Sequence, residues 1–71
     1  MSTGTIQRLI RERGFGFIAG RDGEGIFFHY SQLEGATFHL LKEGQSVRFK
    51  VGLSPKGFEA MDVKLLDKTS E

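Results

Sequence analysis

The chain has 71 residues, with ten basic and nine acidic side chains that leave a formal net charge of only +1. This length suits one small domain, and the lack of cysteine excludes disulfide bonds and thiolate metal sites. No apolar run reaches the roughly 20 residues that span a bilayer, and residues 1–4 lack the layout of a signal peptide. We therefore expect a single cytoplasmic domain, 1–71, with its core at about 4–66 and a frayed tail at 67–71.

Short apolar segments separated by glycines predict an all-β domain. In chain order, we expect strands at residues 4–10, 14–19, 26–29, 45–51 and 58–66. The connections are a glycine-rich segment at 20–25, an irregular crossing with one helical turn at 31–44, and a type I turn at 54–57. Five short strands are too few for a two-sheet sandwich, so we predict a small antiparallel barrel.

Alternation along the expected strands selects the core. In the fourth strand, for example, Val47, Phe49 and Val51 share one face. The predicted core residues are Ile6, Ile18, Ile26, Phe28, Leu33, Val47, Phe49, Val51, Met61 and Val63.

The first strand breaks this alternation. Burial of Ile6 would also bury Arg8, and an unpaired buried arginine is very costly. We therefore expect a bulge near Gln7 that turns Arg8 outward, toward the rings described next.

Two aromatic runs are the most informative feature of the sequence: Arg13-Gly14-Phe15-Gly16-Phe17-Ile18 and Ile26-Phe27-Phe28-His29-Tyr30. In a strand, Phe15 shares a face with Phe17, and Phe27 shares a face with His29. If these rings were core, the apolar residues between them would lie outside, because a one-layer barrel cannot bury both sides. Either choice leaves an apolar patch, which usually indicates binding. We predict that the rings stack unpaired bases and that Arg13 contacts phosphate or stacks through its guanidinium group.

Other chemistry finds little support in the sequence. His29 has no cysteine or histidine at ligand spacing, which favours a stacking or base-contacting role over a metal site. Gly14 and Gly16 lack the third glycine and the helix of a dinucleotide-binding loop, and the carboxylates form no pair suited to acid–base catalysis. We expect no enzymatic activity, cofactor, metal, small-molecule substrate or membrane partner.

Two further rings are ambiguous. Phe38 and Phe58 each flank a loop, and each fits either the core or the binding surface. Thr37 and His39 suggest an exposed loop around Phe38, which favours binding. For Phe58 both alternatives remain open.

The paired runs resemble the two nucleic-acid motifs of bacterial cold-shock proteins, and the resemblance extends from residue 4 to about 65. Domains of the RNA-recognition-motif family carry a similar first run but place their second motif before it and need two helices. The resemblance implies a five-stranded OB-type barrel that binds single-stranded RNA and DNA with low sequence specificity, as a nucleic-acid chaperone without a cofactor. The residues it implies for binding are Arg13, Phe15, Phe17, Phe27, His29, Tyr30, Phe38 and Lys56.

Two positions depart from the pattern of that family. Arg8 stands where the family carries a tryptophan, and Phe58, followed by Glu59, stands where it carries a proline. The missing tryptophan ring costs about 1–2 kcal/mol of stacking, which Arg8 offsets in part because it can stack on a base and contact phosphate. The departures imply weaker binding or a shifted base preference.

The alternative function is a protein-interaction or dimerisation module on a cold-shock scaffold. Near-neutral charge and the altered first strand favour it, because an exposed aromatic patch also suits a protein interface. We expect a monomer, with a homodimer as the alternative.

Overall fold

A computed structural model describes residues 2–20, 23, 25–55 and 57–66 of the chain. Its strands are β1 (Ser2–Ile10), β2 (Phe15–Ala19), β3 (Gly25–His29), β4 (Leu33–Glu34), β5 (Ser46–Ser54) and β6 (Gly57–Leu65). Three single 3-10 turns, η1 (Arg11–Arg13), η2 (Tyr30–Gln32) and η3 (Phe38–Leu40), lie between them. Lys56, the tail predicted at 67–71 and part of the 20–25 connection lie outside the described residues.

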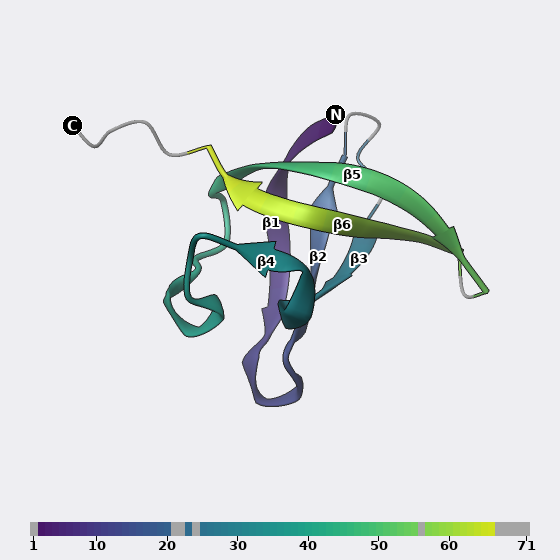
Figure 1. The fold of residues 1–71 in the computed structure, drawn as a ribbon. Coiled ribbons are helices and arrows are strands. Elements are labelled where there is room, and N and C mark those ends of the chain that lie inside the picture. The colour runs from purple at the N-terminus through teal and green to yellow at the C-terminus, as the bar shows by residue number, and fades with distance from the viewer. Residues whose placement is uncertain (1, 21–22, 24, 56, 67–71) are drawn as a thin grey trace.

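The strands form one sheet in the order β3-β2-β1-β5-β6-β4, and an added pairing of β3 with β6 closes it into a barrel. Figure 1 shows β5 and β6 as a long curved hairpin that crosses β1, β2 and β3. The predicted five-stranded all-β barrel is confirmed. The short β4 is an extra strand within the predicted irregular crossing, and the β3–β6 and β4–β6 pairings are parallel rather than antiparallel. In the described part of the chain, no helix has the length and apolar character needed to cross a membrane.

The core fills the inside of this barrel. The buried apolar side chains are Ile6, Ile18, Ile26, Phe28, Phe38, Leu41, Val47, Phe49, Ala60 and Val63. Most of the predicted core is confirmed, and Leu33 packs against it while only partly buried. Two predictions are wrong: Val51 is 43% exposed and Met61 is 37% exposed.

A bulge in β6 explains the error at Met61. Arg48 of β5 pairs with Lys64, but Lys50 pairs with Met61, so β6 holds one residue more than β5 across this step. Asp62 lies in the bulge with a φ of 52°. An extra residue reverses the alternation of a strand, so Ala60 and Val63 both face the core while Met61 faces outward.

The error at Val51 has another cause. The second half of β5 runs with β6 toward the hairpin tip and away from the centre of the barrel (Figure 1). Near that tip Leu53 is 81% exposed and Phe58 is 58% exposed. Val51 therefore keeps the inward parity of Val47 and Phe49 but has less core to pack against.

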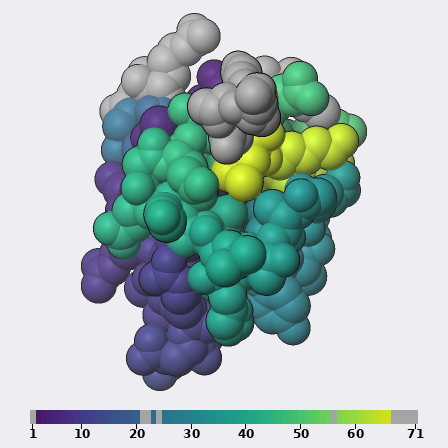
Figure 2. Space-filling view, turned by 90° about the vertical axis from the view of Figure 1, so that its left-hand side faces the viewer, coloured from purple at the N-terminus to yellow at the C-terminus, as the bar shows by residue number. Residues whose placement is uncertain are grey.

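The segment between β4 and β5 covers one side of the barrel. Figure 2 shows it, in teal to green, spread above the β1–β2 turn at the bottom of the view. Its Leu41 is buried, and the Arg11 guanidinium donates a hydrogen bond to the Leu41 carbonyl. This contact ties the β1–β2 turn to the covering segment.

Candidate nucleic-acid interface

The two aromatic runs form one antiparallel pair of strands, β2 and β3. Phe15 pairs with His29, and Phe17 pairs with Phe27. Burial alternates along both strands: these four rings are half-buried, whereas Ile18 and Phe28 have 0% exposure. The predicted division into an inner apolar face and an outer ring face is therefore confirmed. We call Phe15, Phe17, Phe27, His29 and Tyr30 the ring face.

The phenylalanines of the ring face hold one another in place. The ring centroids of Phe15 and Phe27 lie 5.3 Å apart, and Phe17 lies 6.0 Å from each of them. Phe17 meets both neighbours nearly edge-on, at 89° and 72°. Such edge-to-face contacts are favourable, so the three rings form a supported cluster with one side open to solvent.

The glycines between the rings provide space. A Cβ on Gly16 would lie 2.6 Å from the Arg8 carbonyl oxygen and 2.9 Å from the ring of Phe28, so no larger residue fits inside the barrel there. Gly14 has a φ of 75°, and a Cβ there would lie 2.6 Å from the ring of Tyr30. Because the Tyr30 amide also donates to the Gly14 carbonyl at 2.9 Å, Gly14 seats Tyr30 directly against the backbone.

His29 and Tyr30 form the second part of the ring face. Their centroids lie 4.5 Å apart with an interplanar angle of 33°. The Ser31 amide donates to His29 Nδ1 at 3.2 Å, so the neutral imidazole carries its proton on Nε2. His29 therefore combines a flat face for stacking with one ring N–H that can donate to a base.

Phe38 does not lie in an exposed loop, and the prediction that it does is wrong. It is only 7% exposed, and its centroid lies 6.0 Å from Phe28 in the core and 6.3 Å from Tyr30. Within the single turn of η3, Phe38 is buried while Leu40 is 74% exposed. Phe38 thus links the core to Tyr30.

A hollow lies beside Tyr30, with a volume of about 610 Å³. It is lined by Arg11, Glu12, Arg13, Gly14, Tyr30, Thr37, Phe38 and His39. We call it the Tyr30 hollow. It places the exposed Arg13 and His39 next to the Tyr30 end of the ring face, as the argument from sequence expected for Arg13.

The bulge predicted near Gln7 is confirmed. Ile6 pairs with Ile18, but Arg8 pairs with Phe17, so Gln7 is an extra residue in β1. Cross-strand partners share a face of a sheet, and Arg8 is therefore exposed beside Phe17. Ile10, half-buried opposite Phe15, joins the same face. Its place could have been found by counting onward from the bulge.

A groove of about 510 Å³ lies at the Phe17 and Phe27 end of the ring face. It is lined by Phe17, Phe27, Ser54, Pro55, Phe58 and Glu59, and we call it the Phe58 groove. The position of Phe58, which the sequence left open, is resolved: the ring is exposed beside Phe17 and Phe27. Glu59 was not predicted as a site residue, because only the parallel pairing of β3 with β6 brings it beside Phe27.

Comparison with known proteins identifies the family. Residues 2–66 match the model of the 'Cold-shock' DNA-binding domain. The chain belongs to the cold-shock domain family. Among its relatives, "Probable cold shock protein A" of Mycolicibacterium smegmatis is 45% identical over 67 residues, covering 93% of this chain and 100% of the relative. "Cold shock-like protein CspLB" of Listeria monocytogenes is 42% identical over 66 residues, with 93% and 100% covered.

A solved structure supports the same assignment. The chain is similar to "drosophila Unr CSD456", with a TM-score of 0.74 and 25% identity over 99% of this chain. The match spans 28% of that longer chain. This cold-shock domain is therefore similar to one part of a larger protein.

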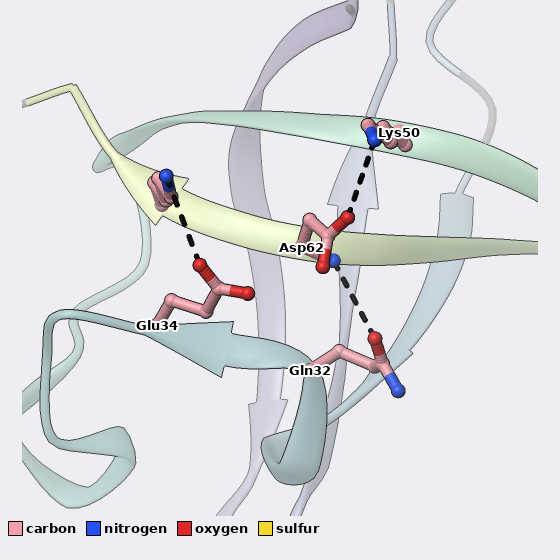
Figure 3. A network of polar contacts seen from close by, with 5 residues as sticks. Gln32, Glu34, Lys50 and Asp62 are labelled. Atoms are coloured by element: carbon pink, nitrogen blue, oxygen red, sulfur yellow. Dashed lines mark hydrogen bonds and ion pairs between the residues drawn. The ribbon is translucent and has the colours of Figure 1, made fainter.

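Some of the basic side chains of this cold-shock domain lie close to carboxylates, away from the ring face. Figure 3 shows a polar network on β4, β5 and β6, in which Lys50 lies 3.6 Å from Asp62. In the same network Lys64 lies 3.7 Å from Glu34. Within the described residues, the basic groups next to the ring face are instead the arginines of β1 and η1. Arg8 lies beside Phe17 at one end of the ring face, and Arg13 lies at its Tyr30 end.

The structure thus brings together most of the site residues predicted from the sequence. The five residues of the ring face, Arg8, Arg13 and Phe58 share one continuous side of the cold-shock domain, with a concavity at each end. Phe38 supports this surface from beneath. Lys56 lies outside the described residues.

Proposed function

We propose that this cold-shock domain binds single-stranded RNA and DNA by stacking unpaired bases on the ring face. Family membership supports nucleic-acid binding in general. The observation that carries the finer proposal is the cluster of Phe15, Phe17 and Phe27, which stays half-exposed on a barrel whose core is filled by other residues. Each stacked base gains about 1–3 kcal/mol from such a ring.

The two concavities support a path for the bound strand along the ring face. The Tyr30 hollow and the Phe58 groove lie at opposite ends of the ring face, and the paired Phe15 and His29 lie between them. Arg8 and Arg13 lie close enough to meet phosphates along this path, and His29 offers an N–H to a base. Because stacking needs bases that are not already paired, the domain binds single strands in preference to duplexes and stabilises melted regions. This is the basis for a chaperone activity that needs no cofactor.

The direct test is a titration with labelled DNA and RNA heptanucleotides at several salt concentrations, with a matching duplex as control. We expect single strands to bind and the duplex to bind far more weakly. With two or three phosphate contacts, the slope of log K against log salt should be shallow, about −1.4 to −2.1, because each contact adds about −0.7 on single strands. Lack of single-strand binding at low salt would contradict the proposal.

Chaperone activity has its own test. A short RNA hairpin with a weak stem, carrying a fluorophore and a quencher, should open as this protein is added. A Phe27→Ala variant should open it less at the same protein concentration. Tight binding of single strands without any opening of the hairpin would separate the two parts of the proposal and reject the chaperone part.

A second candidate is homodimerisation through the β5–β6 hairpin. The observation that favours it is the apolar surface formed by Leu53, 81% exposed, and its cross-strand partner Phe58, 58% exposed. Patches of this kind are common at protein interfaces. Light scattering distinguishes the candidates: a stable dimer without oligonucleotide binding would support dimerisation, and a monomer that binds heptanucleotides would reject it.

A further inference from the structure

Four residues on four neighbouring strands form a row across the ring face. Arg8 of β1 pairs with Phe17 of β2, Phe17 pairs with Phe27 of β3, and Phe27 pairs with Glu59 of β6. Paired residues share a face, so a guanidinium group, two rings and a carboxylate follow one another on the outside of the barrel. The row spans three strand spacings of about 4.8 Å each. We call it the guanidinium–carboxylate row.

An acidic residue such as Glu59 is unusual in the lining of a groove that binds nucleic acid. Glu59 is half-buried and lines the groove together with Phe27 and Phe58. Within the described part of the chain, no hydrogen bond or ion pair holds it. A carboxylate only accepts hydrogen bonds, and it repels phosphates. It favours binding only where the ligand presents hydrogen-bond donors, which in DNA are N–H groups of the bases and in RNA also include the 2′-hydroxyl groups.

Arg8 offers the opposite chemistry at the other end of the row. Its guanidinium group carries five N–H donors in a planar fork and accepts no hydrogen bond. It is exposed beside Phe17, and the described residues offer it no ion-pair partner. A base lying on Phe17 and Phe27 therefore meets donors from Arg8 on one side and an acceptor from Glu59 on the other.

Guanine fits this arrangement best. It carries two acceptors, O6 and N7, on one edge and two N–H donor groups, N1 and N2, on the adjacent edge. Cytosine and adenine each present one exocyclic amino group beside ring acceptors, and uracil and thymine present a single N–H between two carbonyls. Arginine is a common partner of O6 and N7 of guanine. The carboxylate matches the N1 and N2 donors.

We propose that the guanidinium–carboxylate row is a guanine-preferring subsite, with Glu59 and Arg8 as the residues that set the preference. The proposal rests on the proposed function, because it requires a base stacked on Phe17 and Phe27. It adds a preference for guanine at one position of a surface that otherwise contacts bases by stacking. It also assigns a function to Glu59.

The test compares heptanucleotides that differ at one position. The probes are a run of seven thymidines and three others with guanine, adenine or cytosine at the centre. We expect the guanine probe to bind about tenfold tighter than the thymidine run, since one bidentate base contact discriminates by about tenfold or more. A single guanine avoids self-association of the probe. Equal affinity for all four probes would overturn the proposal and leave the proposed function standing. If none of them binds at low salt, the proposed function fails as well.

Single substitutions test which side chains produce the guanine preference. Glu59→Gln should remove much of the guanine preference, measured as the affinity for the guanine probe divided by that for the thymidine run, because it removes one acceptor and a negative charge. Glu34→Gln changes the charge equally on β4, outside the groove, and should leave the preference intact. Using the ratio of two affinities cancels any general effect of charge or stability.

Modified bases test the same contacts from the ligand side. Inosine lacks the N2 amino group of guanine. In the natural protein, replacing guanine by inosine should remove much of the preference, whereas in Glu59→Gln the same replacement should have little further effect. 7-Deazaguanine lacks the N7 acceptor of guanine. In the natural protein, replacing guanine by 7-deazaguanine should remove much of the preference, whereas in Arg8→Gln the same replacement should have little further effect. If Arg8→Gln instead weakens all four probes by the same factor, Arg8 contacts phosphate and its part in the preference is wrong.

Discussion

Replacing Phe17 by alanine separates binding from stability when it is paired with a suitable control. Phe17 is half-buried and makes two edge-to-face contacts, with Phe15 and Phe27. These are worth about 0.5–1.5 kcal/mol each, so the variant should lose about 2 kcal/mol of unfolding free energy. Val47 has 0% exposure. Val47→Ala removes two buried methyl groups at about 0.8 kcal/mol each and leaves a cavity, so it should also lose about 2 kcal/mol.

The two variants therefore have matched stability but different expected affinity. Each should lower the melting temperature by roughly 8–16 °C, because 1 kcal/mol shifts a domain of this size by about 4–8 °C. Phe17→Ala also removes a stacking surface, and its dissociation constant should rise by about 5- to 150-fold, which corresponds to 1–3 kcal/mol. Val47→Ala should bind within about twofold of the natural protein.

The assay is fluorescence anisotropy of a labelled heptanucleotide at a temperature where urea titration shows both variants folded. Melting curves of the same samples verify that the stability losses match. Equal losses of affinity in the two variants would show that binding follows stability and would refute stacking on Phe17. Unchanged affinity in Phe17→Ala would refute it as well.

Three further predictions follow from local geometry. Gly14→Ala should destabilise the fold by at least about 1 kcal/mol and also weaken binding, because Gly14 has a φ of 75° and a Cβ would meet the ring of Tyr30; urea titration and anisotropy measure the two effects. Arg13→Ala should reduce the salt slope of binding by about 0.7 if Arg13 contacts one phosphate, and an unchanged slope would remove Arg13 from the path. Asp62→Gly should be tolerated within about 0.5 kcal/mol, whereas Asp62→Val should cost more, because a β-branched residue is disfavoured at a φ of 52°; similar melting temperatures for the two would contradict this account of the bulge.

The sequence was sufficient wherever one physical cost decided the outcome. The high cost of burying Arg8 required a bulge near Gln7, and the bulge lies there. Likewise, a one-layer barrel cannot bury both sides of β2 and β3, so one apolar set had to face solvent, and Ile18 and Phe28 are buried as the predicted core has them. In both cases the alternative arrangement was too unfavourable to compete.

Prediction failed where the outcome depended on contacts between distant segments. The bulge at Asp62 has no marker in the sequence, so simple alternation placed Met61 inside and missed Ala60. The burial of Phe38 depends on a single 3-10 turn that packs against Phe28. Polar neighbours such as Thr37 gave the opposite indication, because a loop residue can be buried while its neighbours stay in solvent.

The position of Glu59 could not be predicted for a similar reason. It lies on the ring face because β6 pairs with β3 in parallel, and these strands are separated in sequence by residues 30–56. No local pattern near residue 59 indicates such a pairing. The central rings of the candidate site could thus be predicted from the sequence. Glu59 could not, because its position depends on the closure of the barrel.

The way the barrel closes has a consequence for its internal motions. In the described residues β3 and β6 are joined through one register pair, Phe27 with Glu59, whereas β5 and β6 are joined through seven. The seam between β3 and β6 should therefore open locally at a lower free energy than the rest of the sheet. The Phe58 groove lies over this seam and draws its walls from both sides of it. If a nucleotide binds in this groove as proposed, its binding should slow amide exchange at the junction of β3 and β6.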